Sequence, residues 1–287
     1  MKTVLAVDLG GTKTAIARVD EHGKVEERRT LPAAHSLEES VEQVVAATHG
    51  VAAAGVIVPG IFSPATGEAW CPNLWGDRQV PLLSALRQRL PVDVVVDSDR
   101  AGYVLGEAWL GAARGLQHVV FVALGTGIGV GILSDGRLVR GEGGIAGAAG
   151  WFALDSRWNE RYAATGCWEA EAAGPGVARE SGQPDGRAAV AAARAGDRAA
   201  LNALARAGTY TGMGVANLIS AFNPEAVVLG GGFLVGAADL VLETIRAEAR
   251  RWAQPIAASR CRIELTQLGE DAGLLGAARL ALNHVDR

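Results

Sequence analysis

A glycine-rich turn near the start of the chain combines residue types that can bind phosphate. The run from Asp8 to Lys13 reads DLGGTK. At Gly10 and Gly11, backbone N–H groups can approach phosphate oxygens without a side chain in the way, and Thr12 and Lys13 add further donors. Asp8 can hold a hydrated magnesium ion on those phosphates. Taken alone, the glycine pair favours an ordinary tight turn that needs positive φ.

A second turn of the same kind, GTGIG, begins at Gly125. With Thr126 and Gly127 it occupies the equivalent place in the second half of the chain, and two matching turns can hold a polyphosphate from both sides. A third glycine run follows an apolar strand at Gly230 and Gly231, where bare backbone offers a flat surface to a purine. An ordinary helix-entry turn explains this third run equally well. It is therefore the matching pair that favours phosphate binding.

Two carboxylates and an amide lie between the first two turns. Asp97 and Asp99 follow an apolar strand, and a carboxylate placed there can accept the proton of an attacking hydroxyl. Asp97 also fits a plain strand-end carboxylate, whereas Asp99 can serve at the same time as a helix cap. Asn73, in the run PNLW, both donates and accepts hydrogen bonds, as a polyol ligand requires. A turn after Pro72 explains this asparagine equally well.

The elements that must position these residues occur twice along the chain. Each half reads as strand, glycine-rich turn, strand, turn and third strand, followed by helices and further strands. The predicted strands are 3–8, 14–19, 25–30, 51–59, 92–97, 118–124, 129–134, 137–140, 226–231 and 262–265. The predicted helices are 36–50, 82–90, one from Asp99, more than one within about 188–221, 240–252 and one from Asp271. Residues 59–80 are predicted as a binding loop. This repeat indicates two similar α/β domains facing a cleft.

Composition and charge argue against several classes of protein. The chain has 287 residues, of which 49% are hydrophobic and 20% charged, as in a folded globular protein. A net charge of −4 without a basic block argues against nucleic acid or an anionic membrane as a partner. No apolar run reaches the ~18–20 residues of a membrane span, and three widely spaced cysteines argue against a disulfide framework. We expect a soluble, reduced, cytoplasmic protein with a small-molecule partner.

Together the motifs resemble the ROK family (repressors, open reading frames and kinases), a branch of the superfamily of sugar kinases, heat-shock ATPases and actin. The resemblance covers nearly the whole chain, and this combination of motifs in this order is highly specific. The runs that carry it are LAVDLGGTKTAIARVD and VALGTGIGVGILSDGRLVRG for the two phosphate segments, NPEAVVLGGG for the adenosine segment, GVIVPGIFSPATGEAWCPNLWG for the sugar loop and DSDRAGYVLGE for the catalytic segment.

The fold that this resemblance implies is α/β, with two actin-like, ribonuclease H-like domains. We expect a smaller domain at 1–115, which contains the sugar loop and the catalytic aspartate. A larger domain at 116–274 contains the second phosphate segment and the adenosine segment. The last helix, at about 275–287, is expected to pack back on the first domain.

The resemblance also implies an ATP-dependent, glucokinase-like carbohydrate kinase that transfers the γ-phosphoryl group to a primary hydroxyl of a hexose or hexose-like substrate. The fit places the catalytic base at Asp99, with the glycine turns around the phosphates and magnesium near Asp8, held through water. Asn73, Asp99 and Glu169 are the implied sugar contacts. We expect a homodimer.

The chain departs from the family where a structural zinc site is usual. ROK kinases usually have Glu-x-Gly-His and then Cys-x-Cys-Gly-x-x-Gly-Cys-x-Glu, whereas this chain has Ala148 and Trp151 in the first motif. In the second motif Glu160 and Tyr162 replace two cysteines and only Cys167 remains, so we expect no structural zinc. We expect the segment to be held by apolar packing of its aromatic side chains: Trp151, Phe152, Trp158 and Tyr162.

These losses leave other functions open. A sugar hydroxyl near Glu169 has lost at least one partner, so a kinase of a cyclitol or a substituted sugar is one alternative. A catalytically silent sugar-binding sensor is a second, and an ATPase with a protein client is a third. The retained Asp99 and both phosphate turns argue against the sensor, and the PNLW loop argues against the ATPase.

Overall fold

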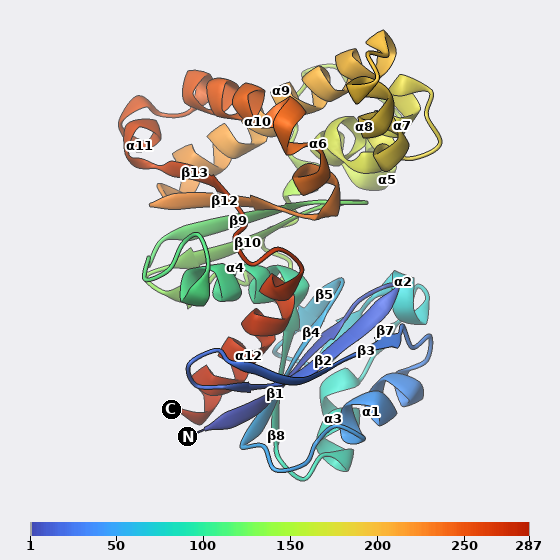
Figure 1. The fold of residues 1–287 in the computed structure, drawn as a ribbon, viewed down its shortest axis with the longest axis vertical. Helices are drawn as coiled ribbons and strands as arrows, with labels where there is room; N and C mark the ends of the chain where they lie inside the picture. The colour runs from blue at the N-terminus through green and yellow to red at the C-terminus, as the bar shows by residue number, and fades with distance from the viewer. Residues whose placement is uncertain (1, 287) are drawn as a thin grey trace. The chain divides into compact units, whose positions relative to one another are not determined.

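The structure is a computed structural model that describes residues 2–286, and these residues divide into two compact units. The first unit takes residues up to 115 together with 138–146 and the segment from 267 onward. The second unit takes 116–137 and 147–266. Figure 1 shows the fold of the chain, with the elements labelled.

The first unit is built on a five-stranded sheet of order β3-β2-β1-β4-β8. Its strands are β1 (Thr3–Leu9), β2 (Lys13–Asp20), β3 (Val25–Pro32), β4 (Ala53–Val58) and β8 (Asp93–Ser98). β1, β2 and β3 are joined by antiparallel pairing, whereas β1, β4 and β8 run parallel. Every residue of β4 is buried, as is typical of a parallel strand that is covered on both faces.

Two helices of the first unit lie side by side against this sheet. α4 (Asp99–Leu110) packs on α12 (Ala272–Val285), and α12 also contacts β1 and β4 (Figure 1). The two helices approach closely because glycines face each other: a Cβ built on Gly276 would lie 1.8 Å from the carbonyl oxygen of Gly102. The other helices of the unit are α1 (Leu37–Val45), α3 (Leu82–Arg89), α2 (Pro72–Trp75) and the 3₁₀ turns Glu142–Gly144 and Gly269–Asp271.

The region predicted as one long loop, 59–80, has more structure than expected. It holds a three-stranded sheet of β5 (Ile61–Ser63), β6 (Glu68–Trp70) and β7 (Gln79–Val80), and the short helix α2. The buried side chains of Leu74 and Trp75 fix α2, and the Trp75 indole donates to Ser40 Oγ at 3.1 Å. The segment is therefore anchored to the core of the unit rather than extended over its surface.

The second unit repeats the plan of the first with the sheet order β11-β10-β9-β12-β13. Its strands are β9 (Val119–Leu124), β10 (Ile128–Ser134), β11 (Arg137–Leu138), β12 (Ala226–Gly230) and β13 (Arg262–Leu265). Its helices are α5 (Tyr162–Thr165), α6 (Cys167–Ala172), α7 (Gly174–Ser181), α8 (Gly186–Arg194), α9 (Arg198–Phe222), α10 (Gly232–Trp252) and α11 (Pro255–Arg260), with a 3₁₀ turn at Ala149–Trp151. The helices predicted within about 188–221 are α8 and α9, and α10 begins eight residues earlier than predicted.

The α/β fold class is confirmed, and in each unit the predicted strand–turn–strand hairpin is extended by parallel strands. Two segments that the sequence analysis assigned to the second domain, 138–146 and 267–274, belong to the first unit. The reason is tertiary contact: Arg140 pairs with Asp97, and buried Glu107 accepts a hydrogen bond from the Leu268 backbone N–H at 3.1 Å. That the two units are separate domains stays a prediction. Among residues 2–286, every helix is too short or too polar to cross a bilayer.

Candidate active site

The parallel register of the first sheet brings its acidic side chains to one edge. Asp8 on β1 is level with Ile57 on β4, and Ile57 is level with Asp97 on β8. Because the carboxyl ends of parallel strands meet at the same edge of a sheet, Asp8 and the start of α4, where Asp99 lies, come together. The sequence-predicted metal residue and the predicted base therefore share one site.

Burial is the main influence on these two carboxyl groups. It raises the pKa of Asp8 to about 7, with a further rise from the charge of Asp99 and an opposing effect of Lys13. It also raises the pKa of Asp99 to about 6, against the lowering effects of the Arg100 charge, the Arg100 backbone N–H and the Tyr103 hydroxyl. With a pKa of about 6, Asp99 is mostly ionised at neutral pH and close to the strength that suits a general base.

The structure distinguishes Asp99 from its neighbour Asp97. Asp97 is 4% exposed, and its Oδ2 accepts from both Arg140 Nε and Arg140 Nη2 at 2.8 Å. Asp99 is the first residue of α4, and its Oδ1 accepts from the backbone N–H of Arg100 at 2.7 Å. The carboxylate of Asp97 is thus occupied by a cation, which favours Asp99 as the base.

Ser98, not Asp99, caps α4. Its side-chain oxygen accepts from the Ala101 backbone N–H at 3.4 Å, so the capping function considered for Asp99 belongs to its neighbour. Asp99 therefore lies inside the first turn, at the end of the helix where the backbone dipole stabilises negative charge.

The first glycine turn is closed by its own backbone and lies against the predicted sugar ligand. Gly10 N–H donates to the Lys13 carbonyl at 3.0 Å, and a Cβ on Gly10 would lie 2.7 Å from that oxygen. A Cβ on Gly11 would be 3.5 Å from Asn73 Cβ, so the turn and α2 are neighbours. Thr12 is exposed, and Lys13 Nζ pairs with Glu270 at 2.6 Å on the exposed surface.

The second glycine turn adjoins Glu169. Gly125 N–H donates to the Gly127 carbonyl at 2.9 Å, and the Gly125 carbonyl accepts from Gly174 N–H at 3.0 Å, while Thr126 lies between the glycines. Glu169 Oε2 accepts from the Ile128 backbone N–H at 2.7 Å, and a Cβ on Gly127 would lie 2.8 Å from the same oxygen. Burial raises the pKa of Glu169, and the bond from Ile128 opposes that rise.

The third glycine run has a packing reason. A Cβ on Gly230 would lie 2.4 Å from the Phe121 ring, and one on Gly231, which has a φ of +92°, would lie 2.3 Å from the Leu124 carbonyl oxygen. Both glycines are therefore required by the approach of β9, which supports the helix-entry explanation. Gly232, the last glycine of the same run, has open space where its Cβ would be.

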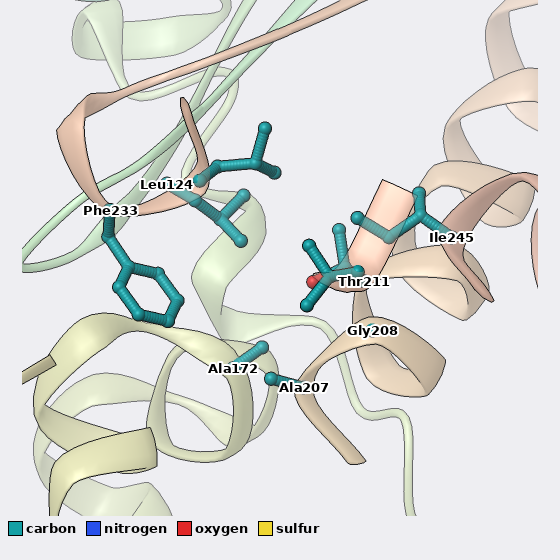
Figure 2. A pocket seen from close by; sticks show the side chains of 9 residues that line it. Leu124, Ala172, Ala207, Gly208, Thr211, Phe233 and Ile245 are labelled. Carbon is teal, nitrogen blue, oxygen red and sulfur yellow. The ribbon is translucent and has the colours of Figure 1, made fainter. Parts of the chain in front are cut away.

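A small pocket lies in the second unit (Figure 2). It is lined by apolar groups from β9, α6, α9 and α10, including Leu124 and Phe233, which flank the second and third glycine runs. The Thr211 hydroxyl is fully buried among them, and among the described residues it has no hydrogen-bond partner.

The segment that replaces the family's usual zinc motif is only partly apolar. Phe152 stacks on buried Trp168 with ring centroids 5.9 Å apart, and Tyr162 is buried. Trp158 is 67% exposed but meets the Tyr162 ring edge-on, with centroids 6.0 Å apart, whereas Trp151 is 58% exposed, so the predicted apolar packing around Trp151 is wrong. Within residues 2–286 no group of three or more His, Cys, Asp or Glu side chains is arranged to hold a metal. The expected lack of structural zinc stays a prediction.

The chain was compared with protein families and known structures. The ROK family model matches residues 4–284. A glucokinase from Streptomyces coelicolor is 31% identical over 98% of each chain, and an N-acetylmannosamine kinase from Citrobacter koseri is 32% identical over 97% of this chain and 98% of its own.

The structure of a ROK family glucokinase from Streptomyces griseus, in complex with glucose and AMPPNP, matches with a TM-score of 0.80. It is 30% identical, with 98% of this chain and 99% of that chain covered. The residues that the family model matches include the glycine turns and the acidic edge of the first sheet. The chain belongs to the ROK family.

Proposed function

We propose that this protein is an ATP-dependent kinase that transfers the γ-phosphoryl group of ATP to a primary hydroxyl of a hexose or hexose-like sugar. The observation that carries the proposal is the pair of Asp8 and Asp99 at one edge of the first sheet, beside the turn that contains Gly10 and Gly11. The glucokinases of the family, one of them holding glucose and an ATP analogue, support the same reaction.

Asp99 acts as the general base in this proposal. The acceptor oxygen attacks the γ-phosphorus, its proton passes to the Asp99 carboxylate, and the bond from the γ-phosphorus to the β–γ bridging oxygen breaks to leave ADP. With a pKa of about 6, Asp99 is mostly ionised at neutral pH and can accept that proton. The Arg100 backbone N–H donates to Asp99 Oδ1 and the Tyr103 hydroxyl also bonds this carboxylate, so the group is held in place for the acceptor.

The phosphates would be held by the two glycine turns, residues 10–12 and 125–127, in which the Gly10 and Gly125 N–H groups close the turn and the backbone amides that follow them donate to phosphate. Magnesium fits the Asp8 carboxyl group, because burial and the nearby Asp99 charge make an ionised Asp8 costly without a cation. When bound, magnesium would neutralise charge on the phosphates. Asp8 would hold it through water, and Thr12 and Lys13 would add donors to the phosphates. The backbone of Gly230 and Gly231 would lie against the purine ring of ATP.

Asn73 and Glu169 are proposed as sugar ligands together with Asp99. Asn73 lies next to Gly11, and its exposed amide can donate and accept. Glu169 uses Oε2 for the Ile128 N–H, which leaves Oε1 for a sugar hydroxyl. Ala148 and exposed Trp151 offer less hydrogen bonding than a Glu and a His would. We therefore infer that a substituted or less polar ring, such as an N-acetylated amino sugar or a cyclitol, is accepted at least as well as glucose.

The biological setting is proposed from the family resemblance. We infer a cytoplasmic homodimer that uses ATP and magnesium and has a small-molecule sugar or cyclitol as its substrate. Neither nucleic acid nor a membrane is an inferred partner, because the net charge is −4 and no basic block is present.

A screen of acceptors coupled to ADP release tests the proposal. The panel holds hexoses, amino sugars, N-acetylated amino sugars and cyclitols, with ATP and magnesium, and Asp99→Asn serves as the control. The proposal expects ADP release that depends on one class of acceptor and is lost in Asp99→Asn. Acceptor binding without ADP release would favour the silent sensor instead, and ADP release that no acceptor changes would favour an ATPase.

A further inference from the structure

The second unit contains a buried acid, Glu171, that the proposed reaction does not use. Glu171 is 5% exposed and lies on α6, two residues after Glu169. Its Oε1 accepts from the Tyr162 hydroxyl at 2.6 Å and from Arg161. Its Oε2 accepts from Arg206 Nε at 2.8 Å and pairs with Arg206 Nη2 at 2.7 Å. Both oxygens of one carboxylate are thus bound to groups from other segments.

These bonds join three parts of the unit. Arg161 and Tyr162 belong to the segment that enters α5, whereas Arg206 lies on the long helix α9. Glu171 therefore connects this segment and α9 to α6. Sequence separations of nine and ten residues on one side and 35 on the other mean that the bonds fix tertiary rather than local structure.

A second layer of contacts surrounds the carboxylate. The Tyr210 hydroxyl donates to Asp155 Oδ2 at 3.2 Å and accepts from Arg206 Nη2 at 3.2 Å. The guanidinium of Arg206 also lies over the Tyr210 ring, 4.9 Å from its centroid, and that of Arg161 lies 5.4 Å from the Tyr162 ring centroid. We call these six residues the Glu171 cluster: Asp155, Arg161, Tyr162, Glu171, Arg206 and Tyr210.

The cluster is electrically balanced. The guanidinium groups of Arg161 and Arg206 both bind the Glu171 carboxylate, and Asp155 pairs with Arg157 at 3.6 Å. Burial by itself would raise the pKa of Glu171, but the bonds from Tyr162, Arg161 and Arg206 outweigh it and lower that pKa. A buried carboxylate is expensive unless it is paired and hydrogen-bonded, and Glu171 meets both conditions. It therefore stays charged and bound at neutral pH.

The short helix α6 links the cluster to the proposed sugar site. Residues two apart on a helix point to nearly opposite sides, about 200° around the axis. Glu171 accordingly faces α5 and α9, while Glu169 faces the second glycine turn, where it accepts from Ile128 N–H. α6 has only six residues, so its backbone is too short to hold its own orientation. The rotation that aims Glu169 is therefore fixed by tertiary contacts, those of Glu171 together with the packing of buried Trp168.

We propose that Glu171 is a positioning residue for the acceptor site: its carboxylate, bound by Arg161, Tyr162 and Arg206, holds α6 so that Glu169 meets both the glycine turn and the sugar. The inference rests on the proposed function for the role of Glu169 as a sugar ligand. One member of the cluster, Tyr162, stands at a position where the family usually has a cysteine, and Arg161 is its neighbour in the chain. Their charged and phenolic side chains hold this segment to Glu171.

The test compares Glu171→Gln with a matched control in the same unit. Glu243→Gln removes an acid that pairs with Arg246 at 3.1 Å on the exposed surface of α10. In Glu171→Gln the acceptor KM should rise about tenfold or more, while the ATP KM stays within about twofold. In Glu243→Gln both constants should stay within about twofold of the unchanged protein, because exposed pairs contribute little.

A second measurement does not depend on activity. Amide hydrogen exchange in residues 155–168 should be about tenfold faster or more in Glu171→Gln and unchanged in Glu243→Gln. Tyr162→Phe, which removes one bond and keeps the ring, should shift the acceptor KM in the same direction by a smaller factor. This variant keeps the test decisive if Glu171→Gln does not fold.

The results separate the two proposals. Equal rises in both KM values, or faster exchange with an unchanged acceptor KM, would overturn the positioning role and leave only a structural one. Unchanged exchange in Glu171→Gln would overturn the clamp. A wild-type protein that phosphorylates no acceptor would instead overturn the proposed function, whatever the exchange experiment shows.

Discussion

Replacing Asp99 by asparagine should stabilise the protein while it removes activity. Asparagine has nearly the same shape and keeps an oxygen that can accept from the Arg100 N–H, which is 2.7 Å from Asp99 Oδ1. What it removes is the negative charge. Because burial raises the pKa of Asp99 to about 6 from the usual value of 3.8, the folded state holds that charge at a cost.

The size of this cost follows from the shift. A pKa raised by about two units corresponds to about 3 kcal/mol of destabilisation at pH 8, at about 1.4 kcal/mol per unit. Asp99 is not fully buried, so solvent reduces the effect, and we expect Asp99→Asn to raise the free energy of unfolding by about 1–3 kcal/mol at pH 8. The Asp99 charge also raises the pKa of Asp8. Removing that charge lowers the cost of ionised Asp8, which stabilises the variant further.

The pH dependence has a definite sign. A carboxyl group with a raised pKa in the folded state is charged in both states at pH 8, where its cost is fully present. As the pH falls through about 6 toward 3.8, the folded state takes up its proton first and the cost disappears. The stability advantage of Asp99→Asn should therefore be largest at pH 8 and nearly absent at pH 4.

Urea denaturation of both proteins at pH 8 and pH 4 measures these differences. Turnover should fall about a hundredfold or more in Asp99→Asn, with nucleotide affinity little changed. The electrostatic reasoning would be refuted if Asp99→Asn were less stable than the wild type at pH 8. It would also be refuted if the gain in the free energy of unfolding were the same at pH 8 and pH 4. Turnover close to that of the wild type would refute the assignment of the base.

Four further outcomes are expected. Thr211→Val should raise the free energy of unfolding by about 1 kcal/mol in urea denaturation, because it removes a buried hydroxyl without a described partner; a loss of stability would show that the hydroxyl is bonded. Arg140→Met should lower the free energy of unfolding by about 2 kcal/mol at pH 8 and by less at pH 5. Burial raises the pKa of Asp97, so the unpaired carboxylate takes up a proton as the pH falls. An equal loss at both pH values would count against the pair. Glu169→Ala should raise the acceptor KM in steady-state kinetics and leave the ATP KM nearly unchanged, whereas equal changes would remove Glu169 from the sugar site. Elemental analysis should find no stoichiometric zinc, and one tightly held zinc per chain would contradict the reading of the degenerate motif.

The sequence predicted those parts of the site that local patterns encode. β-branched apolar runs around glycines specify the two hairpins, so the Asp8 turn and the Gly125 turn have the predicted positions. Asp99 was placed through the family resemblance, but its preference over Asp97 rests on Arg140, which lies 43 residues away. No local pattern indicates that pair.

The errors have a common physical cause. The aromatic residues between 151 and 162 suggested an apolar cluster, yet Trp151 and Trp158 are exposed and the segment is held through buried Glu171. Periodicity reports which residues are apolar, whereas a paired charge is buried only when distant segments supply its partners. The early start of α10 at Gly232 was missed for a related reason, since glycine punctuates a sequence whether or not a helix begins there.

The most direct test of the kinase function follows the phosphoryl group itself. ATP labelled isotopically in its γ-phosphoryl oxygens is incubated with magnesium, the protein and the best acceptor from the screen, and the products are analysed by mass spectrometry. If Asp99 activates a sugar hydroxyl for attack on the γ-phosphorus, all the transferred label appears in a sugar phosphate, and Asp99→Asn forms almost none. Label found only in inorganic phosphate, with the sugar unchanged, would contradict the assignment of a sugar kinase.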